Sequence, residues 1–498
     1  MKQTEWKIIY SAYTGIAEKA INLLSKEGGK YLIRNSGLLR LHVLPCEKES
    51  EYTESKNAFF VSCINDSPLI QKYVDIKEVP ENGYLVKVIK KPSDETGRFV
   101  ILTAHTRQEL FYSVVSFLDD YIYKYAPNDS HQYRPDLIFD GIGNHFSGVT
   151  EQLLPECCYT EVPEFKTRSI FTWGHSINNY KAYIDNMARL KLNELIIWND
   201  FIPLNISNII DYAHLYGIKV ILGYSWGWRE IPTNDDITAE NIEKVQNMVI
   251  KKYKDEYSLT NCDGIYFQTF TEAGADKYVN GKPLARYAID MINSISKELK
   301  KITPGLRLLF GLHSFTVKDH LDIISELDKD VEIYWENLGG TYPFNYGTSV
   351  NGNVEEYEKT NEFLKKVLEL RGGTGSTIVF KSIMMLDWSP GNFIVQRGPY
   401  IMGENAEVIT EHDRACRTSS WRQFAADWIK NGNDAAKVVK LIKDNKKDNS
   451  GVCIAGTLTL DAGICLPVAI YAQMFRNPSP DYADILHTVT RRECVRFE

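Results

Sequence analysis

From Arg168 onward the chain repeats one pattern of hydrophobic and polar positions. A short, almost continuously apolar run is followed by a polar segment and then by an amphipathic stretch with helical period, and this order recurs. Eight apolar runs predict strands at residues 169–173, 194–198, 219–224, 264–269, 307–312, 332–335, 377–384 and 451–457. The clearest intervening helices are predicted at residues 178–190, 206–216, 239–254, 284–300 and 354–370.

Eight repeats of a strand and a helix over roughly 310 residues favour a (β/α)8 TIM barrel, an α/β fold with a ring of helices outside the strands. The near-continuous apolar character of the strands fits this fold, because such strands are buried on both faces. A doubly wound open sheet is the competing fold, since the pattern does not show that the sheet closes.

The first 150 residues show a different pattern, in which short β-rich runs alternate with amphipathic helices. Strands are predicted at residues 6–11, 58–64, 83–89 and 99–104. The helix after the last strand begins at Thr106, with Glu109 three residues on as in a capping box. We therefore predict a smaller α/β domain at residues 1–150, before a barrel domain with a helical C-terminal end at residues 151–498. Residues 128–166 are predicted to form a connector with little structure of its own.

Composition narrows the classes of partner. Of the 498 residues 44% are hydrophobic and 24% charged, which is ordinary for a folded protein with sizeable cores. The net charge of -8, with acidic and basic residues mixed, provides no basic stripe for a nucleic-acid backbone. No apolar run is long enough to cross a membrane. Neither nucleic acid nor a membrane is therefore an expected partner.

Cysteine usage and the N-terminus bear on location. Nine cysteines without a CxxC pair favour free thiols in a reducing compartment. The first residues, Met1-Lys-Gln-Thr-Glu-Trp-Lys7, lack the apolar core of a secretory leader. A cytoplasmic location is expected, although a chain from which a leader had been removed would look the same.

Tryptophans gather at the predicted strand ends, where barrel enzymes place their active sites. Six of the nine lie at or just past these ends: Trp173, Trp198, Trp226, Trp228, Trp335 and Trp388. Indole faces suit the C–H faces of sugar rings, and each ring nitrogen can donate a hydrogen bond. The alternative is that these side chains only fill the top of the barrel. Six at one end favour a carbohydrate as the small-molecule substrate.

Four carboxylates lie at the same level, after the second, fourth, sixth and seventh strands: Asp200, Glu272, Glu336 and Asp387. Hydrolysis of a glycosidic bond needs one carboxylic acid to protonate the leaving oxygen and one carboxylate to attack or to activate water. Glu272 follows an apolar strand beside aromatic residues, where desolvation would raise its pKa as a general acid requires. We predict Glu272 as the general acid, with a capping or loop role as its alternative. Glu336, Asp387 and Asp200 are candidates for the second carboxylate, and a structural role is the alternative for each of them.

Further polar side chains at the strand ends are suited to orient sugar hydroxyls: Asn199, Asp200, Arg229, Gln268, His313 and Asn337. A lone histidine such as His313 is more often structural than catalytic. The sequence has no H-x3-H or HExxH spacing. We therefore predict no metal ligands and no cofactor.

Several segments resemble the α-glucuronidases and related hexosaminidase-like glycosidases, which place a small α/β domain before a catalytic barrel. Residues 83–88, 98–104 and 109–118 look like the end of that small domain, and residues 183–198 look like the first barrel helix and second strand. The segment Gln268-Thr-Phe-Thr-Glu272-Ala-Gly is similar to the α-glucuronidase segment that carries the acid glutamate. The resemblance implies that Glu272 is the proton donor. It also implies that carboxylates after the sixth and seventh strands, here Glu336 and Asp387, activate water with inversion at the anomeric carbon.

Two departures bear on the substrate. The α-glucuronidases have a lysine four residues before the acid, where this chain has Gln268, and no arginine follows the fifth strand here. A neutral sugar, or a carboxylate held by Arg229 or Arg397, remains open. The hexosaminidase pattern of adjacent Asp-Glu is absent, because Thr271 precedes the acid. A retaining hexosaminidase-like enzyme and a carbohydrate-binding barrel without catalysis remain the alternatives.

Overall fold

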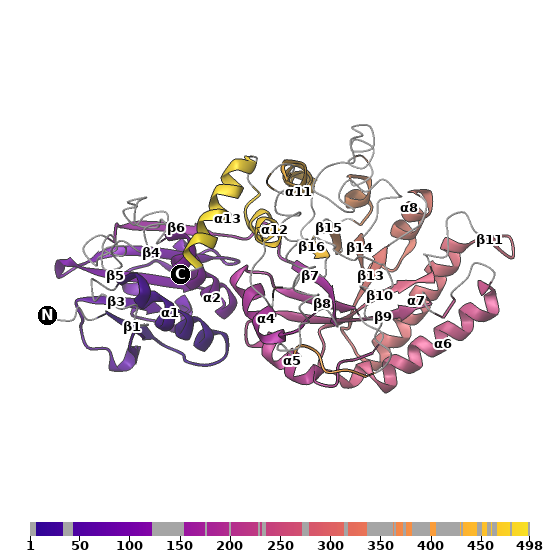
Figure 1. Cartoon of the computed structure of the whole chain (residues 1–498), viewed down its shortest axis with the longest axis horizontal. Coiled ribbons are helices and arrows are strands. Elements are labelled where there is room, and N and C mark those ends of the chain that lie inside the picture. Colours follow the sequence, from indigo (N-terminus) through magenta and orange to yellow (C-terminus); the bar gives the residue numbers. More distant parts are fainter. Residues whose placement is uncertain are drawn as a thin grey trace, which may run out of the picture. The chain divides into compact units, whose positions relative to one another are not determined.

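A computed structural model describes most of the chain, which divides into two compact units (Figure 1). The described residues are 6–32, 43–121, 154–174, 177–198, 201–227, 230–231, 236–270, 278–312, 317–335, 362, 365–371, 375–380, 399–404, 429, 432–445, 451–455, 460, 466–478 and 481–496. One unit comprises Met1–Pro163, Leu215–Gly217 and His487–Glu498, and the other comprises Glu164–His214 and Ile218–Leu486.

The first unit is built on one six-stranded sheet with the order β2-β1-β3-β5-β4-β6. Its strands are β1 (Trp6–Tyr10), β2 (Cys46–Lys48), β3 (Asn57–Val61), β4 (Tyr84–Lys91), β5 (Asp94–Ala104) and β6 (Cys157–Glu161). Its helices are α1 (Ile16–Leu32), α2 (Arg107–Ser116) and the short η1 (Glu49–Glu51), η2 (Ile64–Asp66), η3 (Ile70–Lys72), η4 (Ile76–Glu78) and η5 (Phe117–Tyr121). The four strands predicted from the sequence are confirmed as β1, β3, β4 and β5.

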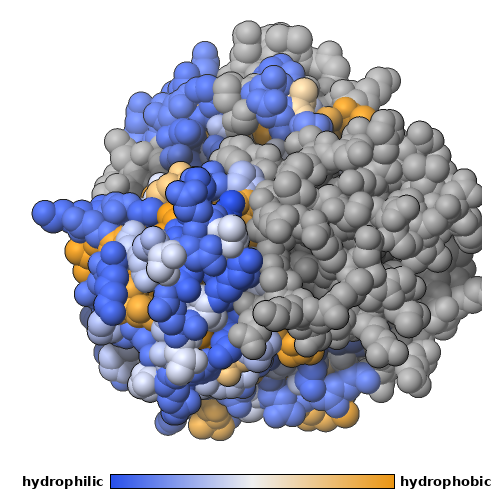
Figure 2. Space-filling view, turned by 90° about the vertical axis from the view of Figure 1, so that its left-hand side faces the viewer, coloured by the Kyte–Doolittle hydropathy of each residue, from blue (hydrophilic) through white to orange (hydrophobic). Residues whose placement is uncertain are grey.

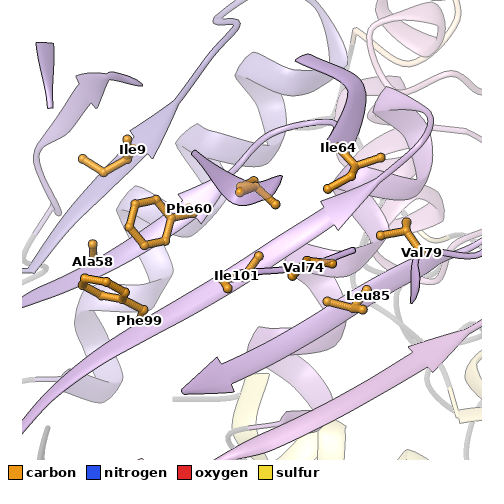
Figure 3. Close-up of a cluster of buried hydrophobic side chains, with 10 residues drawn as sticks. Ile9, Ala58, Phe60, Ile64, Val74, Val79, Leu85, Phe99 and Ile101 are labelled. Carbon is orange, nitrogen blue, oxygen red and sulfur yellow. The ribbon is translucent and has the colours of Figure 1, made fainter. Parts of the chain in front are cut away.

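This sheet is buried on both faces. Phe59 packs on Phe117 after the end of α2, with ring centroids 5.3 Å apart, whereas its neighbour Phe60 packs on Phe99 at 5.0 Å. Successive side chains of a strand point to opposite faces, so the two contacts mark two separate cores. The core on the side of Phe60 is shown in Figure 3 and consists of Ile9, Ala58, Phe60, Ile64, Ile70, Val74, Val79, Leu85, Phe99 and Ile101.

The boundary between the units lies at Pro163 rather than at residue 150. The reason is β6, which pairs antiparallel with β4 from Tyr84↔Glu161 to Val88↔Cys157 and so completes the first sheet. The prediction of an unstructured connector through residue 166 is therefore wrong for this stretch. Only residues 162–167 separate β6 from the first barrel strand.

The second unit is a closed barrel of eight parallel strands, as the apolar repeats predicted. In barrel order its strands are β7 (Arg168–Trp173), β8 (Glu194–Trp198), β9 (Lys219–Trp226), β10 (Gly264–Thr269), β13 (Arg307–Leu312), β14 (Val331–Trp335), β15 (Ser376–Phe380) and β16 (Gly451–Ala455). The pairing of β16 with β7 closes the ring, so the open-sheet alternative is wrong.

Helices follow the barrel strands and lie around them in Figure 1. Their bounds are α4 (Tyr180–Arg189), α5 (Ile206–His214), α6 (Ala239–Asp255), α7 (Leu284–Ile302), α8 (Val317–Glu326), α11 (Asn433–Asn445) and α12 (Leu466–Arg476). The last helix, α13 (Tyr482–Arg496), is divided between the two units, because the first unit includes His487–Glu498. Smaller elements are η10 (Tyr257–Leu259), β11 (Tyr278–Val279) and β12 (Lys282–Pro283). Of the helix predicted at 354–370, the structure describes residues 362 and 365–370, all of them helical.

Every barrel strand contributes to one interior core, which consists of Phe171, Ile196, Trp198, Ile221, Tyr266, Leu309, Tyr334, Val379 and Cys453. These residues fix which side chains point inward, because the inward positions of a strand are two residues apart. On β9, for example, Ile221, Gly223 and Ser225 point inward and Trp226 points outward toward the helices.

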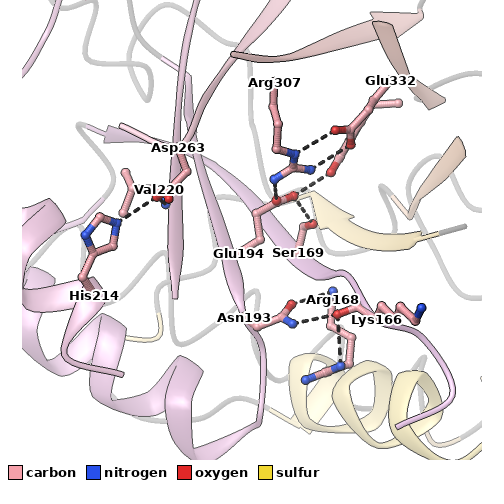
Figure 4. A network of polar contacts seen from close by, with 11 residues as sticks. Lys166, Arg168, Ser169, Asn193, Glu194, His214, Val220, Asp263, Arg307 and Glu332 are labelled. Atoms are coloured by element: carbon pink, nitrogen blue, oxygen red, sulfur yellow. Dashed lines mark hydrogen bonds and ion pairs between the residues drawn. The ribbon is translucent and has the colours of Figure 1, made fainter. Parts of the chain in front are cut away.

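Charged side chains close the amino end of this interior (Figure 4). The Arg307 guanidinium donates two hydrogen bonds to Glu332, at 2.7 and 2.8 Å, and one to Oε2 of Glu194 at 2.5 Å. Oε1 of Glu194 accepts from the hydroxyls of Ser169 at 2.7 Å and Tyr334 at 2.6 Å. The side chain of Glu194 is only 1% exposed, so this end of the barrel is sealed by a paired network.

A second polar contact joins the end of α5 to the strands (Figure 4). Nε2 of His214 lies 2.9 Å from Oδ2 of Asp263, which also accepts the backbone N–H of Val220 at 2.7 Å. The hydrogen bond to Asp263 raises the pKa of His214. Burial alone would raise the pKa of Asp263, but the hydrogen bonds from His214 and Val220 outweigh burial and lower it.

The face drawn in Figure 2 carries mainly hydrophilic residues where the chain is described, and its apolar residues form small separate patches. Such scattered apolar residues are normal on a protein surface. None of the described helices has the length and apolar character that a membrane span requires. The described cysteines, Cys46, Cys63, Cys157, Cys158, Cys262 and Cys453, are free thiols.

Candidate active site

The carboxyl ends of all eight strands meet at one end of the barrel, which we call the mouth. Four neighbouring strands place aromatic or polar side chains at inward positions there, and these side chains belong to Trp173, Trp198, Ser225 and Gln268. The strand register joins them as two pairs, because Trp173 pairs with Trp198 across β7 and β8, and Ser225 pairs with Gln268 across β9 and β10, two residues nearer the carboxyl end than Gly223, the partner of Trp198. We call these four residues the mouth row.

The two tryptophans of the mouth row differ in exposure. Trp198 is only 7% exposed and its ring meets Tyr266 edge-on, with centroids 5.6 Å apart. Trp173 is partly exposed and packs edge-on against Phe171 at 5.2 Å. Trp198 therefore forms part of the floor, whereas Trp173 still has surface for a ligand.

Gly223 makes room for the indole of Trp198. Its backbone pairs with Trp198 across β8 and β9, and a Cβ atom at this position would lie 2.6 Å from Cε3 of the indole. A separation below 3 Å is not tolerated between carbon atoms, so a glycine is needed beside this tryptophan. The sequence analysis did not single out Gly223.

Gln268 continues the mouth row on β10. Its side chain is almost buried, since the residue is 8% exposed, and Nε2 donates to the hydroxyl of Tyr266 at 3.2 Å. The amide therefore has a fixed orientation at the mouth. Its neutral charge matters for the substrate, because an amide can hydrogen-bond a sugar hydroxyl but cannot form an ion pair with a carboxylate.

Trp226 does not fit the predicted role of a sugar contact. Its ring is completely buried and stacks on Phe267, with centroids 3.6 Å apart and planes 8° apart. The sequence placed the end of this strand at residue 224, but β9 continues to Trp226. Because it lies one position after the inward Ser225, Trp226 points to the helix side and packs there.

Glu230 is a mouth residue that the sequence analysis missed. Its Oε2 accepts hydrogen bonds from Oγ of Ser225 at 2.7 Å and from the backbone N–H of Gly227 at 3.0 Å. The residue itself is exposed. Arg229 beside it was singled out instead, because nothing in the sequence shows that the turn after β9 folds back onto the inward Ser225.

Most of the predicted site residues lie outside the described residues. These are Asn199, Asp200, Trp228, Arg229, Glu272, His313, Glu336, Asn337, Asp387 and Trp388. Trp335 ends β14, but its side chain is not among those described. Two of the predicted carboxylates nevertheless follow described strands in the sequence. Strand β10 ends at Thr269, shortly before Glu272, and β14 ends immediately before Glu336.

Metal-ligating side chains do not cluster in the described part of the chain. Across those residues no group of three or more His, Cys, Asp or Glu side chains is arranged to hold a metal ion.

No family model matches the chain, and no curated protein matches it either. Among solved structures, the chain is similar to a family GH115 4-O-methyl-α-glucuronidase, BtGH115A, described as specific for decorated arabinogalactans. The match has a TM-score of 0.50 at 11% identity and covers 95% of this chain and 57% of that one. The chain shares its overall fold with that enzyme. It spans little more than half the length of that glucuronidase, and at this identity the likeness concerns the fold alone. A weaker likeness, with a TM-score of 0.46 at 11% identity, covers 96% of this chain and 69% of CpGH84D.

Proposed function

We propose that this protein is a glycoside hydrolase in which carboxylates at the barrel mouth cleave the glycosidic bond of an oligosaccharide or glycoside. The observation that carries the proposal is the mouth row, in which two tryptophans, a serine and a glutamine occupy inward positions at the carboxyl ends of four neighbouring strands. Barrel enzymes build their active sites at this end. The fold shared with an α-glucuronidase supports the same conclusion.

In this proposal Glu272 is the general acid. It follows β10, the strand that carries Tyr266 and Gln268, and the proposal requires its carboxyl to lie beside aromatic side chains. Such surroundings raise the pKa of a carboxyl and keep it protonated near neutral pH. The proton then goes to the glycosidic oxygen as the bond to the anomeric carbon breaks.

Glu336 and Asp387 are proposed as the carboxylates that activate water, with inversion in the manner of an α-glucuronidase. Inversion requires the acid and base carboxyl groups to be roughly 6.5–9.5 Å apart, whereas retention through a glycosyl-enzyme requires roughly 5–5.5 Å. A retaining, hexosaminidase-like reaction is the alternative. Proton NMR of the first anomer released distinguishes the two outcomes directly.

Trp173 supplies the proposed sugar platform, because its indole is partly exposed at the mouth and packs edge-on against Phe171. Gln268 would orient a sugar hydroxyl from the adjacent side of the mouth. Neither contact requires a metal or an organic cofactor.

The test is a screen of glycosides with two kinds of leaving group, 4-nitrophenol and a simple alcohol. The wild type is compared with Glu272→Ala, Glu336→Ala and Asp387→Ala, and with Glu240→Ala as a matched control on the exposed face of α6. Loss of a general acid lowers kcat by about 100- to 10,000-fold for the alcohol, which needs protonation, and much less for 4-nitrophenolate. Loss of the base lowers kcat similarly for both.

Two results would contradict the proposal. Unchanged kcat in Glu272→Ala with the alcohol glycoside would exclude Glu272 as the acid. Wild type that hydrolyses no glycoside, but binds sugars equally well before and after Glu272→Gln, would identify a carbohydrate-binding barrel without catalysis.

A further inference from the structure

The carboxylate of Glu230 is held at the mouth by only one of its oxygens. Both of its hydrogen bonds, from Ser225 and from the backbone of Gly227, end on Oε2. Oε1 has no partner among the residues that the structure describes, and the residue is exposed. A carboxylate oriented in this way presents two lone pairs to whatever enters the mouth.

The position of Glu230 follows from the strand register. Ser225 points into the barrel at the last inward position of β9, beside Gln268 on β10. Since Oγ of Ser225 is 2.7 Å from Oε2 of Glu230, the carboxylate lies directly above the mouth row. The turn that brings it there is also fixed by its backbone, because the N–H of Ile231 donates to the carbonyl of Gly227 at 3.1 Å.

The described part of the mouth therefore carries a negative charge without a compensating cation. No ion pair joins Glu230 to a lysine or arginine within the described ranges, and its neighbour in the row, Gln268, is neutral. A carboxylate on the substrate would meet a like charge, which disfavours its binding. Sugar hydroxyls, in contrast, donate hydrogen bonds to a carboxylate, and such charge-assisted bonds are stronger than neutral ones.

We propose that Glu230 is a specificity-determining residue, which accepts hydrogen bonds from the hydroxyls of a neutral sugar and disfavours a uronate. This inference rests on the proposed function, because it assigns the class of sugar that the same mouth binds. It makes the substrate a neutral glycoside, in which no carboxylate is attached to the ring at the mouth.

The decisive variant is Glu230→Gln. Glutamine keeps the shape of the side chain and an oxygen that accepts from Ser225 and Gly227, so the turn is retained while the charge is removed. Glu240→Gln is the matched control, because Glu240 is an exposed carboxylate on α6 that pairs with Lys244. Both proteins are compared with wild type after equal thermal stability has been verified.

Binding is measured by titration calorimetry with the methyl glycosides of glucose, galactose, xylose and N-acetylglucosamine and with methyl glucuronide. Wild type is expected to bind at least one neutral glycoside more tightly than the glucuronide. Glu230→Gln should weaken the binding of that neutral glycoside by about 10- to 100-fold and shift the binding preference toward the glucuronide. Glu240→Gln should leave both values unchanged.

The outcomes separate this inference from the proposed function. A wild type that prefers the glucuronide, or a preference unchanged by Glu230→Gln, overturns the inference even if glycosides are hydrolysed. The protein could prefer a neutral glycoside, with a preference that depends on Glu230, and yet hydrolyse no glycoside. That result would support the inference and contradict the proposed hydrolase function. Absence of binding to every sugar tested overturns both.

Discussion

At the amino end of the barrel the charged groups of Arg307, Glu194 and Glu332 bind one another, whereas at the carboxyl end Glu230 presents a carboxylate oxygen to the mouth. The amino-end side chains lie at inward positions of β8, β13 and β14, whereas Glu230 follows β9 in the chain and accepts a hydrogen bond from the inward Ser225. Burial by itself would lower the pKa of the Arg307 guanidinium, but Glu194 and Glu332 outweigh burial and raise it. At the amino end, each charged side chain therefore pairs with an oppositely charged side chain from another strand. The difference indicates that polar groups at the amino end stabilise the ring, while those at the mouth are available to a ligand.

The largest effect is expected from Arg307→Met, which breaks the amino-end network. Glu194 and Glu332 would be left as buried or half-buried carboxylates without their cation, at a cost of about 3–5 kcal/mol in the free energy of unfolding. Urea unfolding of the barrel, followed by tryptophan fluorescence, measures this cost. Arg286→Met is the control, because its pair with Glu326 is well exposed and contributes less than about 1 kcal/mol. Equal stability of the two variants would contradict the assignment.

A pair of tryptophan variants sharpens the contrast between packing and binding. Trp226→Ala removes a fully buried ring that stacks on Phe267, and should cost about 3–5 kcal/mol of stability with little change in KM at low temperature. Trp173→Ala should raise KM by about tenfold, the equivalent of a lost aromatic contact, and destabilise the barrel less. If Trp226→Ala raised KM more than Trp173→Ala, the inward and outward assignments would be reversed.

Gly223→Ala tests the floor of the mouth. The new methyl group would overlap the indole of Trp198, and such overpacking costs about 1–3 kcal/mol. Thermal unfolding should show this loss, and KM should rise because the floor is displaced. Trp198→Phe provides the rescue: in the double variant the smaller ring should restore part of the stability. Strictly additive effects would show that the two positions do not touch.

The smallest effect concerns the contact between His214 and Asp263, which is half exposed and therefore contributes less than about 1 kcal/mol. Because the folded protein raises the pKa of His214, the contribution of its charge is complete below the unfolded value of about 6.5 and is lost as pH rises through the folded pKa. The difference in Tm between wild type and His214→Gln should therefore be largest near pH 5–6 and shrink toward pH 9. A difference that grows over this interval would contradict the pairing.

The barrel could be predicted from the sequence because each strand is an apolar run that can be recognised from its own residues, without knowledge of its distant partners. The edge strand β6 was missed for the opposite reason. Its sequence, Cys157-Cys-Tyr-Thr-Glu161, lies near prolines and has no strong alternation, and it becomes a strand only through pairing with β4.

The same limit applies to the mouth. The positions of Trp173, Trp198 and Gln268 at the mouth could be predicted because these residues lie near the ends of well-defined strands. Strand β9 continues two residues beyond its predicted end, so Trp226 belongs to the strand rather than to the loop after it. Its side chain points away from the barrel interior, because neighbouring positions of a strand face opposite sides. Glu230 depends on how a turn folds back, and no local pattern encodes that geometry.

The pairing of β6 with β4 has a practical consequence for dividing the chain. Cutting at residue 150 would remove β6 from the N-terminal unit and leave the backbone of Tyr84–Val88 without its neighbour on one side. An open strand of this length is a template for intermolecular association. Cutting after Pro163 keeps the sheet edge covered, so the longer fragment should stay monomeric at concentrations where the shorter one aggregates.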